Sequence, residues 1–305
     1  MHTDKRQLFP GMRRDEAIAV VRRELAACGI AEPYAEARRL LLRSLDLSAE
    51  ALLMNPAATL TPFDVEALSA WCARRVGREP LGRIAGEREF YGRIFRLSEG
   101  TLEPRPDSET LIDASLELLA RQGKLNGPLR IIDVGTGSGC LLLTLLAELP
   151  HATGVGTDIS ADALKTAAVN AHRLGLSDRV SWKQMAGLDQ IDETFDLLVS
   201  NPPYIPTAAI AGLDPEVRCF DPLAALDGGT DGLDVYRAIA REHRRVVPEG
   251  ISVLEFGAGQ AAEVIRVFEQ QVWTGAEESR LEILGKWRDL GGHERCVAFR
   301  TLCKR

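Results

Sequence analysis

The sequence predicts an α/β fold with a mostly parallel sheet, preceded by a small all-α N-terminal domain and a connecting β-hairpin. Three observations carry this prediction. From residue 129 onward, strand patterns alternate with helical patterns, which is typical of parallel sheets with crossover helices. The first eighty residues place apolar side chains only at helical spacing. The 305 residues also suffice for about two domains.

Residues 1–80 are expected to form the helical domain. Their apolar residues recur every three or four positions, and capping residues or prolines stand where helices would begin. Three of the four expected helices begin near Asp15, which can cap the first, near Pro33 and near Thr61-Pro62, and they end near Gly29, Leu45 and Gly77. A short helix is expected after Ser48.

Residues 81–106 are predicted to form a hairpin and linker. The segments 88–91 and 93–97 read as short strands on either side of Gly92. The two prolines of segment 104–106 then hold the chain extended, and a helix follows over about 108–121.

Residues 107–305 are expected to form the main α/β domain. Helices are predicted near 139–149 and 161–174, after Asp231 and after Gly259. The expected strands are 129–134, 153–158, 179–184, 195–200, 251–256, 281–284 and 295–302.

Charge and composition exclude several classes of protein. The chain carries 37 Lys and Arg against 44 Asp and Glu, a net charge of −7. Proteins that depend on phosphate-backbone contacts usually carry a basic surface, so direct nucleic-acid binding is not expected. The first 78 residues are net +2 and the rest net −9. This asymmetry is either incidental or marks a partner-docking segment on an acidic body.

Cysteine and histidine usage predicts neither disulfides nor a metal site. The six cysteines form no C-x-x-C pair, and the five histidines show no ligand spacing. We therefore expect reduced thiols in a cytoplasmic protein. We also expect no signal peptide and no membrane span, because the most apolar stretch, 141–149, is far too short.

A glycine loop follows the first strand of the α/β domain. Residues 135–139 read Gly-Thr-Gly-Ser-Gly and lead into a helix, so backbone amides can approach a ligand closely. The loop lacks the Gly-Lys-Ser/Thr ending of a P-loop and the glycine spacing of dinucleotide-binding proteins. By itself the loop is a weak signal, and a tight strand-to-helix turn without a ligand is the alternative.

Asp158 ends the second strand, about 20 residues beyond the glycine loop. A carboxylate at this position can bind both hydroxyls of a ribose. The alternative is a helix N-cap before Ser160. Together, the loop and Asp158 favour a site for a nucleoside cofactor.

An Asn-Pro-Pro-Tyr turn, Asn201 to Tyr204, follows the fourth strand. The prolines stiffen the turn, so that the Asn201 amide oxygen and the Pro202 carbonyl can accept both hydrogens of one planar NH₂ group while Tyr204 stacks on it. Such a nitrogen is a poor nucleophile because its lone pair is delocalised. Two fixed acceptors would orient it toward an electrophilic methyl group.

These motifs resemble the class I S-adenosylmethionine-dependent methyltransferases, which have a Rossmann-like sheet and include enzymes that modify planar NH₂ groups. Four further segments are similar to the HemK (PrmC) protein-(glutamine-N5) methyltransferases, and the resemblance covers nearly the whole chain. The segments are 83–90, 104–111, 226–233 and 287–295.

The resemblance implies N5-methylation of the glutamine in the Gly-Gly-Gln motif of class 1 peptide chain release factors, which the helical domain would dock. Asn201 and Pro202 would be the catalytic residues, and Pro203 and Tyr204 would complete the substrate site. The cofactor would be S-adenosyl-L-methionine, leaving as S-adenosyl-L-homocysteine. Its site would comprise Gly135, Thr136, Gly137, Ser138, Gly139, Asp158 and Asn201.

Other functions stay open at this point. A sister branch of the family methylates a glutamine of ribosomal protein L3, but it usually has Pro-Arg-Ser-Pro where residues 104–107 read Pro-Arg-Pro-Asp. Nucleic-acid adenine N6-methyltransferases face the same chemical problem but need base flipping and a basic surface. A binding scaffold without activity would show an eroded loop or a lost Asn201.

One departure from the family concerns adenine recognition. Where the family usually has an acidic pair such as Asp-Trp after the third strand, residues 184–189 read Gln-Met-Ala-Gly-Leu-Asp. Either Asp189 or a backbone group is expected to take over this contact.

Overall fold

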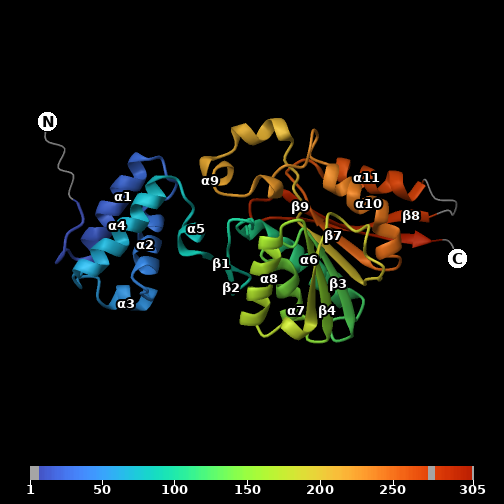
Figure 1. Ribbon diagram of the computed structural model, residues 1–305, viewed down its shortest axis with the longest axis horizontal. Coiled ribbons are helices and arrows are strands. Elements are labelled where there is room, and N and C mark those ends of the chain that lie inside the picture. Colours follow the sequence, from blue (N-terminus) through green and yellow to red (C-terminus); the bar gives the residue numbers. More distant parts are fainter. Residues whose placement is uncertain (1–6, 274–278, 304–305) are drawn as a thin grey trace. The chain divides into compact units, whose positions relative to one another are not determined.

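The computed structural model describes residues 7–273 and 279–303. The chain divides into two compact units, residues 1–86 and 87–305. Figure 1 shows the first as a group of helices and the second as a sheet with helices on both faces. Among the helices of the described residues, none combines the length and the apolar character needed to cross a lipid bilayer.

The first unit is helical, as the spacing of its apolar residues predicts. Leu25, Leu40, Leu41 and Leu68 are fully buried in its core. Its helices are α1 (Arg14–Ala27), α2 (Pro33–Ser44), α3 (Ala49–Met54), α4 (Pro62–Val76) and α5 (Leu81–Ala85).

Local sequence explains where three of these helices begin. The Ser48 hydroxyl accepts a hydrogen bond from the Ala51 amide, and Thr61 forms a reciprocal capping box with Asp64. The expectation that Asp15 caps the first helix is wrong. The N-cap is Arg13, two residues earlier, and Asp15 lies in the first turn of the helix, where its negative charge interacts favourably with the helix dipole.

The second unit starts with the predicted hairpin. Strands β1 (Glu87–Phe90) and β2 (Arg93–Arg96) pair antiparallel. Tyr91 and Gly92 between them both have positive φ, 50° and 72°, as a two-residue hairpin turn requires. The expected linker 81–106 is therefore divided, since α5 belongs to the first unit and the hairpin to the second.

The seven-stranded sheet has the order β5-β4-β3-β6-β7-β9-β8. The first five strands run parallel, and β9 and β8 add to one edge antiparallel, which confirms the mostly parallel α/β fold. Its strands are β3 (Leu129–Val134), β4 (Ala152–Asp158), β5 (Val180–Gln184), β6 (Leu197–Ser200), β7 (Ile251–Glu255), β8 (Ser279–Arg288) and β9 (Glu294–Cys303).

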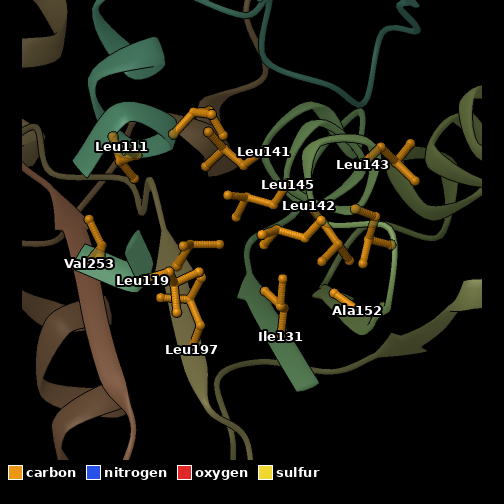
Figure 2. Packing of buried hydrophobic residues seen from close by; sticks show 14 of the residues in the cluster. Leu111, Leu119, Ile131, Leu141, Leu142, Leu143, Leu145, Ala152, Leu197 and Val253 are labelled. Atoms are coloured by element: carbon orange, nitrogen blue, oxygen red, sulfur yellow. The ribbon is translucent and has the colours of Figure 1, made fainter. Parts of the chain in front are cut away.

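Helices cover both faces of this sheet. Alternate strand residues point to opposite faces, so Ile131 packs with α6 and α7 whereas Ile132 packs with α10 and α11. Figure 2 shows the first of these layers, where Leu142 and Leu145 lie over Ile131 and Leu197. The main helices are α6 (Glu109–Arg121), α7 (Cys140–Glu148), α8 (Ala161–Arg173), α10 (Asp234–Val246) and α11 (Ala261–Trp273).

Candidate cofactor and substrate site

A cavity of about 980 Å³ lies at the carboxyl ends of the parallel strands. The chain builds β3, β4 and β5 toward one edge and then crosses over to β6 and β7. The end of β3 and the end of β6 therefore meet where the strand order reverses, which is where open α/β sheets bind ligands. The glycine loop (135–139), Asp158 and Asn201 reach the cavity from three of these strand ends.

The glycine loop is shaped by backbone conformations that side chains disfavour. Gly135, Gly137 and Gly139 have φ of 74°, 54° and 80°. The amides of Gly135 and Thr136 both donate to the Thr157 carbonyl at 2.9 Å, which fixes the loop to β4. A Cβ added at Gly135 or Gly137 would meet nothing within 4 Å, so bare backbone faces open space there.

Asp158 is held by the loop it faces. Its carboxylate accepts hydrogen bonds from the Gly137 and Ser160 amides, each at 2.9 Å. Burial raises the pKa of this carboxyl, and the backbone hydrogen bonds oppose that effect. The N-cap of α8 is Ser160, whose hydroxyl accepts from the Ala163 amide. Asp158 is therefore not the helix cap that the alternative interpretation required.

Asn201 directly follows β6 and lines the cavity. The preceding residue, Ser200, donates its hydroxyl to the Val134 carbonyl at 2.6 Å and so joins the ends of β6 and β3. The Asn201 Nδ2 atom donates to Ser108 Oγ at 3.0 Å. The asparagine amide is therefore fixed on its nitrogen side, beside the loop that supplies Ser108.

Of the three residues that follow Asn201 in the turn, only Pro203 lines the cavity within the described residues. Pro202 is buried. Tyr204 does not appear among the lining residues in the described part of the chain. Its ring packs against the backbone of Gly257, where an added Cβ would approach Tyr204 Cδ2 to 3.1 Å. Burial raises the pKa of Tyr204 to about 12, so its hydroxyl stays neutral at physiological pH.

The remaining residues of the glycine loop lie partly at the cavity and partly outside it. Thr136 and Ser138 line the cavity, and Gly139 caps α7 just outside it. A Cβ at Gly139 would lie 3.0 Å from Leu143 Cδ1 and 3.2 Å from Ala167 Cβ. This glycine therefore serves close packing of the helix rather than contact with a ligand.

The adenine end of the expected cofactor site is apolar. Ile159, Met185, Val235 and Ala238 line the cavity together with Ala186 and Gly187. Asp189 is exposed and does not line the cavity in the described residues. Of the two alternatives expected above, residues 186–187 are therefore the ones that reach the cavity, and Asp234 also lines it.

A second loop closes the opposite side. The segment between β6 and α10 returns over the strand ends, and residues 222–225 of it line the cavity. Arg105 Nη2 contacts Asp221 Oδ2 at 2.5 Å, and Asp221 also accepts from the Glu103 amide. Asp221 therefore fastens this segment to the loop before α6.

Three buried polar residues behind the site were not expected from the sequence. Asp133 accepts the Thr136 hydroxyl at 2.6 Å, and burial raises its pKa to about 7. Asn170 joins the hairpin to the glycine loop through Arg96 and the Ser138 carbonyl. Glu255 ends β7 beside Asn201.

The sequence alone could have indicated two of the three buried polar residues. Asp133 and Glu255 are acidic residues at the ends of otherwise apolar strand patterns, at the sheet edge where ligands bind. Asn170 lies inside a helical pattern and carries no such signal.

Comparison with known proteins gives two family matches. Residues 107–211 match the methyltransferase small domain, and residues 16–86 match the PrmC N-terminal domain. The two matches fall in the second and first structural units.

Curated relatives extend over most of the chain. A release factor glutamine methyltransferase of Agrobacterium fabrum is 42% identical over 284 residues, 93% of this chain and 96% of its own length. One of Bradyrhizobium diazoefficiens is 44% identical and covers 84% of this chain and 86% of its own length.

Solved structures share the fold at lower identity. The catalytic domain of hMettl16, in complex with MAT2A 3'UTR hairpin 6, is 16% identical with a TM-score of 0.52. The match covers 75% of this chain and 81% of that one. This likeness concerns the fold alone.

Proposed function

Because this chain belongs to the family of release factor glutamine methyltransferases, we propose that it methylates N5 of a glutamine side chain in class 1 peptide chain release factors, within their Gly-Gly-Gln motif. The observation that carries the proposal is Asn201 at the end of β6, in the same cavity as the glycine loop and Asp158. The proposed substrate places the protein in the cytoplasm.

The methyl donor is S-adenosyl-L-methionine, and the cavity residues fit it. Open space above Gly135 and Gly137 leaves their backbone free to border the amino-acid part. Asp158 uses one lone pair of each oxygen for backbone amides, so both oxygens can still accept from the ribose hydroxyls. The apolar wall at Ile159 and Val235 suits the faces of an adenine ring.

The chemistry that the donor supplies is a methyl group on a positively charged sulfur. The contribution of the chain is to hold a weakly nucleophilic amide nitrogen in line with it. In this proposal Asn201 Oδ1 and the Pro202 carbonyl accept the two N–H groups of the glutamine, so the nitrogen lone pair faces the methyl group. Transfer forms the N–C bond, breaks the C–S bond and leaves one amide proton to be released to solvent.

The proposed substrate is a protein rather than nucleic acid. A net charge of −7, with only +2 over the first 78 residues, does not favour duplex binding, which usually relies on a strongly basic surface. The hMettl16 likeness does not count against this interpretation, because it shows the fold only.

A competition experiment tests the proposal. The protein is incubated with methyl-labelled donor and equal amounts of a class 1 release factor, ribosomal protein L3 and duplex DNA. We expect label on the release factor alone, located by mass spectrometry on the glutamine of the Gly-Gly-Gln motif. A release factor with alanine in place of that glutamine is the matched control and should stay unlabelled. Label on DNA or on L3 instead would refute the assignment.

A further inference from the structure

Glu255 presents a buried carboxyl group directly behind the proposed substrate site. It is 2% exposed at the carboxyl end of β7, the strand next to β6. Its Oε2 atom has no hydrogen-bond partner within residues 7–273 and 279–303. A buried carboxyl with an unpaired oxygen is costly and therefore calls for an explanation.

The neighbours of Glu255 connect it to Asn201. The register of β6 and β7 pairs Ser200 with Leu254, so Asn201 and Glu255 follow side by side. The side chains of Ser108 and Asn201 favour the ionised form of the Glu255 carboxyl and lower its pKa. Ser108 is 3% exposed and accepts from Asn201 Nδ2 at 3.0 Å, so the asparagine turns its NH₂ side away from the cavity. The amide oxygen of Asn201 must then face the other way, toward the cavity that Asn201 lines.

We propose that Glu255 is the positioning residue of the site, and that its carboxylate holds the Asn201 amide with Oδ1 presented to the substrate nitrogen. This inference rests on the proposed function. A negative charge on the donor side of an amide polarises it and makes its oxygen a stronger acceptor. The same charge favours the positive charge that develops on the nitrogen as the methyl group arrives.

The charged surroundings of Glu255 decide when it is ionised. Arg295 favours the carboxylate and Asp107 opposes it, and these two residues form an ion pair at 3.1 Å. The outcome of burial and these contacts is a pKa of about 7. The other titratable groups that interact with it from neighbouring elements are Tyr204, Tyr236, Cys140 and Cys296.

The inference predicts a dependence of turnover on pH. The ionised carboxyl is the active form, so kcat should rise as pH increases through about 7 and then level off. Protonation below that pH gives Glu255 a donor of its own and releases its hold on the Asn201 nitrogen.

The variant Glu255→Gln tests this on the full chain with a release factor as substrate. We expect kcat to fall roughly tenfold to a hundredfold, the KM for the methyl donor to stay nearly constant, and the rise of kcat near pH 7 to disappear. Tyr236→Phe is the matched control, because the hydrogen bond that the Tyr236 hydroxyl makes within the described residues goes to the main-chain carbonyl of Glu255, at 2.6 Å, and not to its carboxyl. This variant should keep the wild-type pH profile.

A second readout does not depend on turnover. In protein labelled with ¹⁵N-asparagine, the Nδ2 signals of Asn201 should shift with a midpoint near pH 7 in the wild type and stay constant in Glu255→Gln. Asn201→Ala identifies these signals. If the wild type labels no release factor, the proposed function fails while this titration still tests the Glu255 contact.

Two outcomes would overturn the inference. One is a folded Glu255→Gln variant with wild-type kcat and pH profile, and the other is an Asn201 signal that does not titrate. Should Glu255→Gln not fold, the titration of the Asn201 signals in the wild type decides the inference.

Discussion

Asn201 shows how one side chain depends on groups that the substrate never touches. Its nitrogen is fixed by Ser108, which stands on the loop before α6. Its backbone is held by Pro202 and by the Ser200 hydroxyl bond to β3. The acceptor position is therefore set by three separate segments, which is the kind of preorganisation that methyl transfer to an amide requires.

Replacing Asn201 with alanine should separate catalysis from cofactor binding. The variant loses one of the two proposed acceptors and keeps the glycine loop and Asp158 intact, so we expect kcat to fall by about two orders of magnitude or more. Affinity for the methyl donor, measured by calorimetry, should change by less than about threefold, since the Asn201 side chain adds at most one contact there. If kcat of the variant stays within tenfold of the wild type, Asn201 does not have the proposed catalytic role.

At the same scale, the sequence predicted residues that belong to a linear motif and missed those that do not. Asn201 and Asp158 follow strands at a recognisable spacing, and the structure brings both to one cavity. Ser108 lies in segment 104–111, which is similar to the family, but the linear sequence does not indicate what its side chain contacts. Its contact with Asn201 spans 93 residues, and only the fold brings the two together.

Among the elements, the glycine loop needs glycine for two different reasons, a positive φ and close packing against neighbouring side chains. Gly137 and Gly139 both have positive φ, but a Cβ at Gly137 meets open space, whereas at Gly139 it meets Leu143, Ala167 and Trp182 within 3.3 Å. A side chain would therefore strain the backbone at both positions, but it would collide with neighbouring atoms only at Gly139.

Alanine at these two glycines should therefore destabilise the fold unequally. We expect Gly137→Ala to lower the free energy of unfolding by about 1 kcal/mol and Gly139→Ala by about 2–4 kcal/mol. Urea unfolding of the two variants measures the difference, and each serves as the control for the other. Equal losses would mean that the crowding at Gly139 is relieved without cost.

The hairpin and the glycine loop are connected through a single residue of α8. Asn170 is fully buried, accepts from the Arg96 amide at 2.8 Å, and donates to the carbonyls of Arg96 and Ser138 at 3.1 and 2.9 Å. These three bonds are the polar connection of β2 to the loop that borders the cofactor site.

Asn170→Ala should loosen both segments together. Three buried backbone groups lose their partner, so we expect a loss of about 2–4 kcal/mol in unfolding free energy and faster hydrogen exchange at the Arg96 amide. The exposed Asn126 provides the control as Asn126→Ala. If exchange at Arg96 stays at the wild-type rate, the hairpin is held by other contacts.

For the elements as a whole, periodicity predicted type better than boundaries. The buried runs of β3, β6 and β7 were evident because parallel strands are apolar on both faces. The edge strand β8 extends to ten residues although only four were expected, since its pairing with β9 rather than its own apolar pattern sets its length.

On the scale of the whole molecule, the sequence predicted the class of sheet but not the order of its strands. Alternation of strands and helices requires parallel neighbours, and right-handed crossovers restrict the order without choosing one. The placement of β6 next to β3 creates the site, and only the structure shows it. The same arrangement encloses two carboxyl groups, Asp133 and Glu255, inside the molecule.

These buried carboxyls give the fold a pH dependence whose sign can be worked out. Burial raises the pKa of Asp133 and of Glu255 to about 7, above their unfolded values near 4. Between these limits the folded state binds more protons than the unfolded state, so stability falls as pH rises and the contribution is lost above about pH 7. The buried His243 has a pKa lowered to about 4, so it acts in the opposite direction, and its effect fades as pH rises through about 6.5.

The two carboxyls dominate the interval from pH 6.5 to 7.5, because His243 becomes largely neutral in the unfolded state over this range and ordinary thiols titrate near pH 8.5. Over this interval the free energy of unfolding of the wild type should fall by on the order of 1 kcal/mol, shared between Asp133 and Glu255. In Asp133→Asn, which keeps the shape and removes the titration, about half of this decrease should disappear, while the exposed-site control Asp192→Asn should retain all of it. Urea unfolding of the three proteins at both pH values measures the change in each. A decrease of the same size in Asp133→Asn would mean that Asp133 has the same pKa in the folded and unfolded states, and that the buried strand end at β3 is open to water.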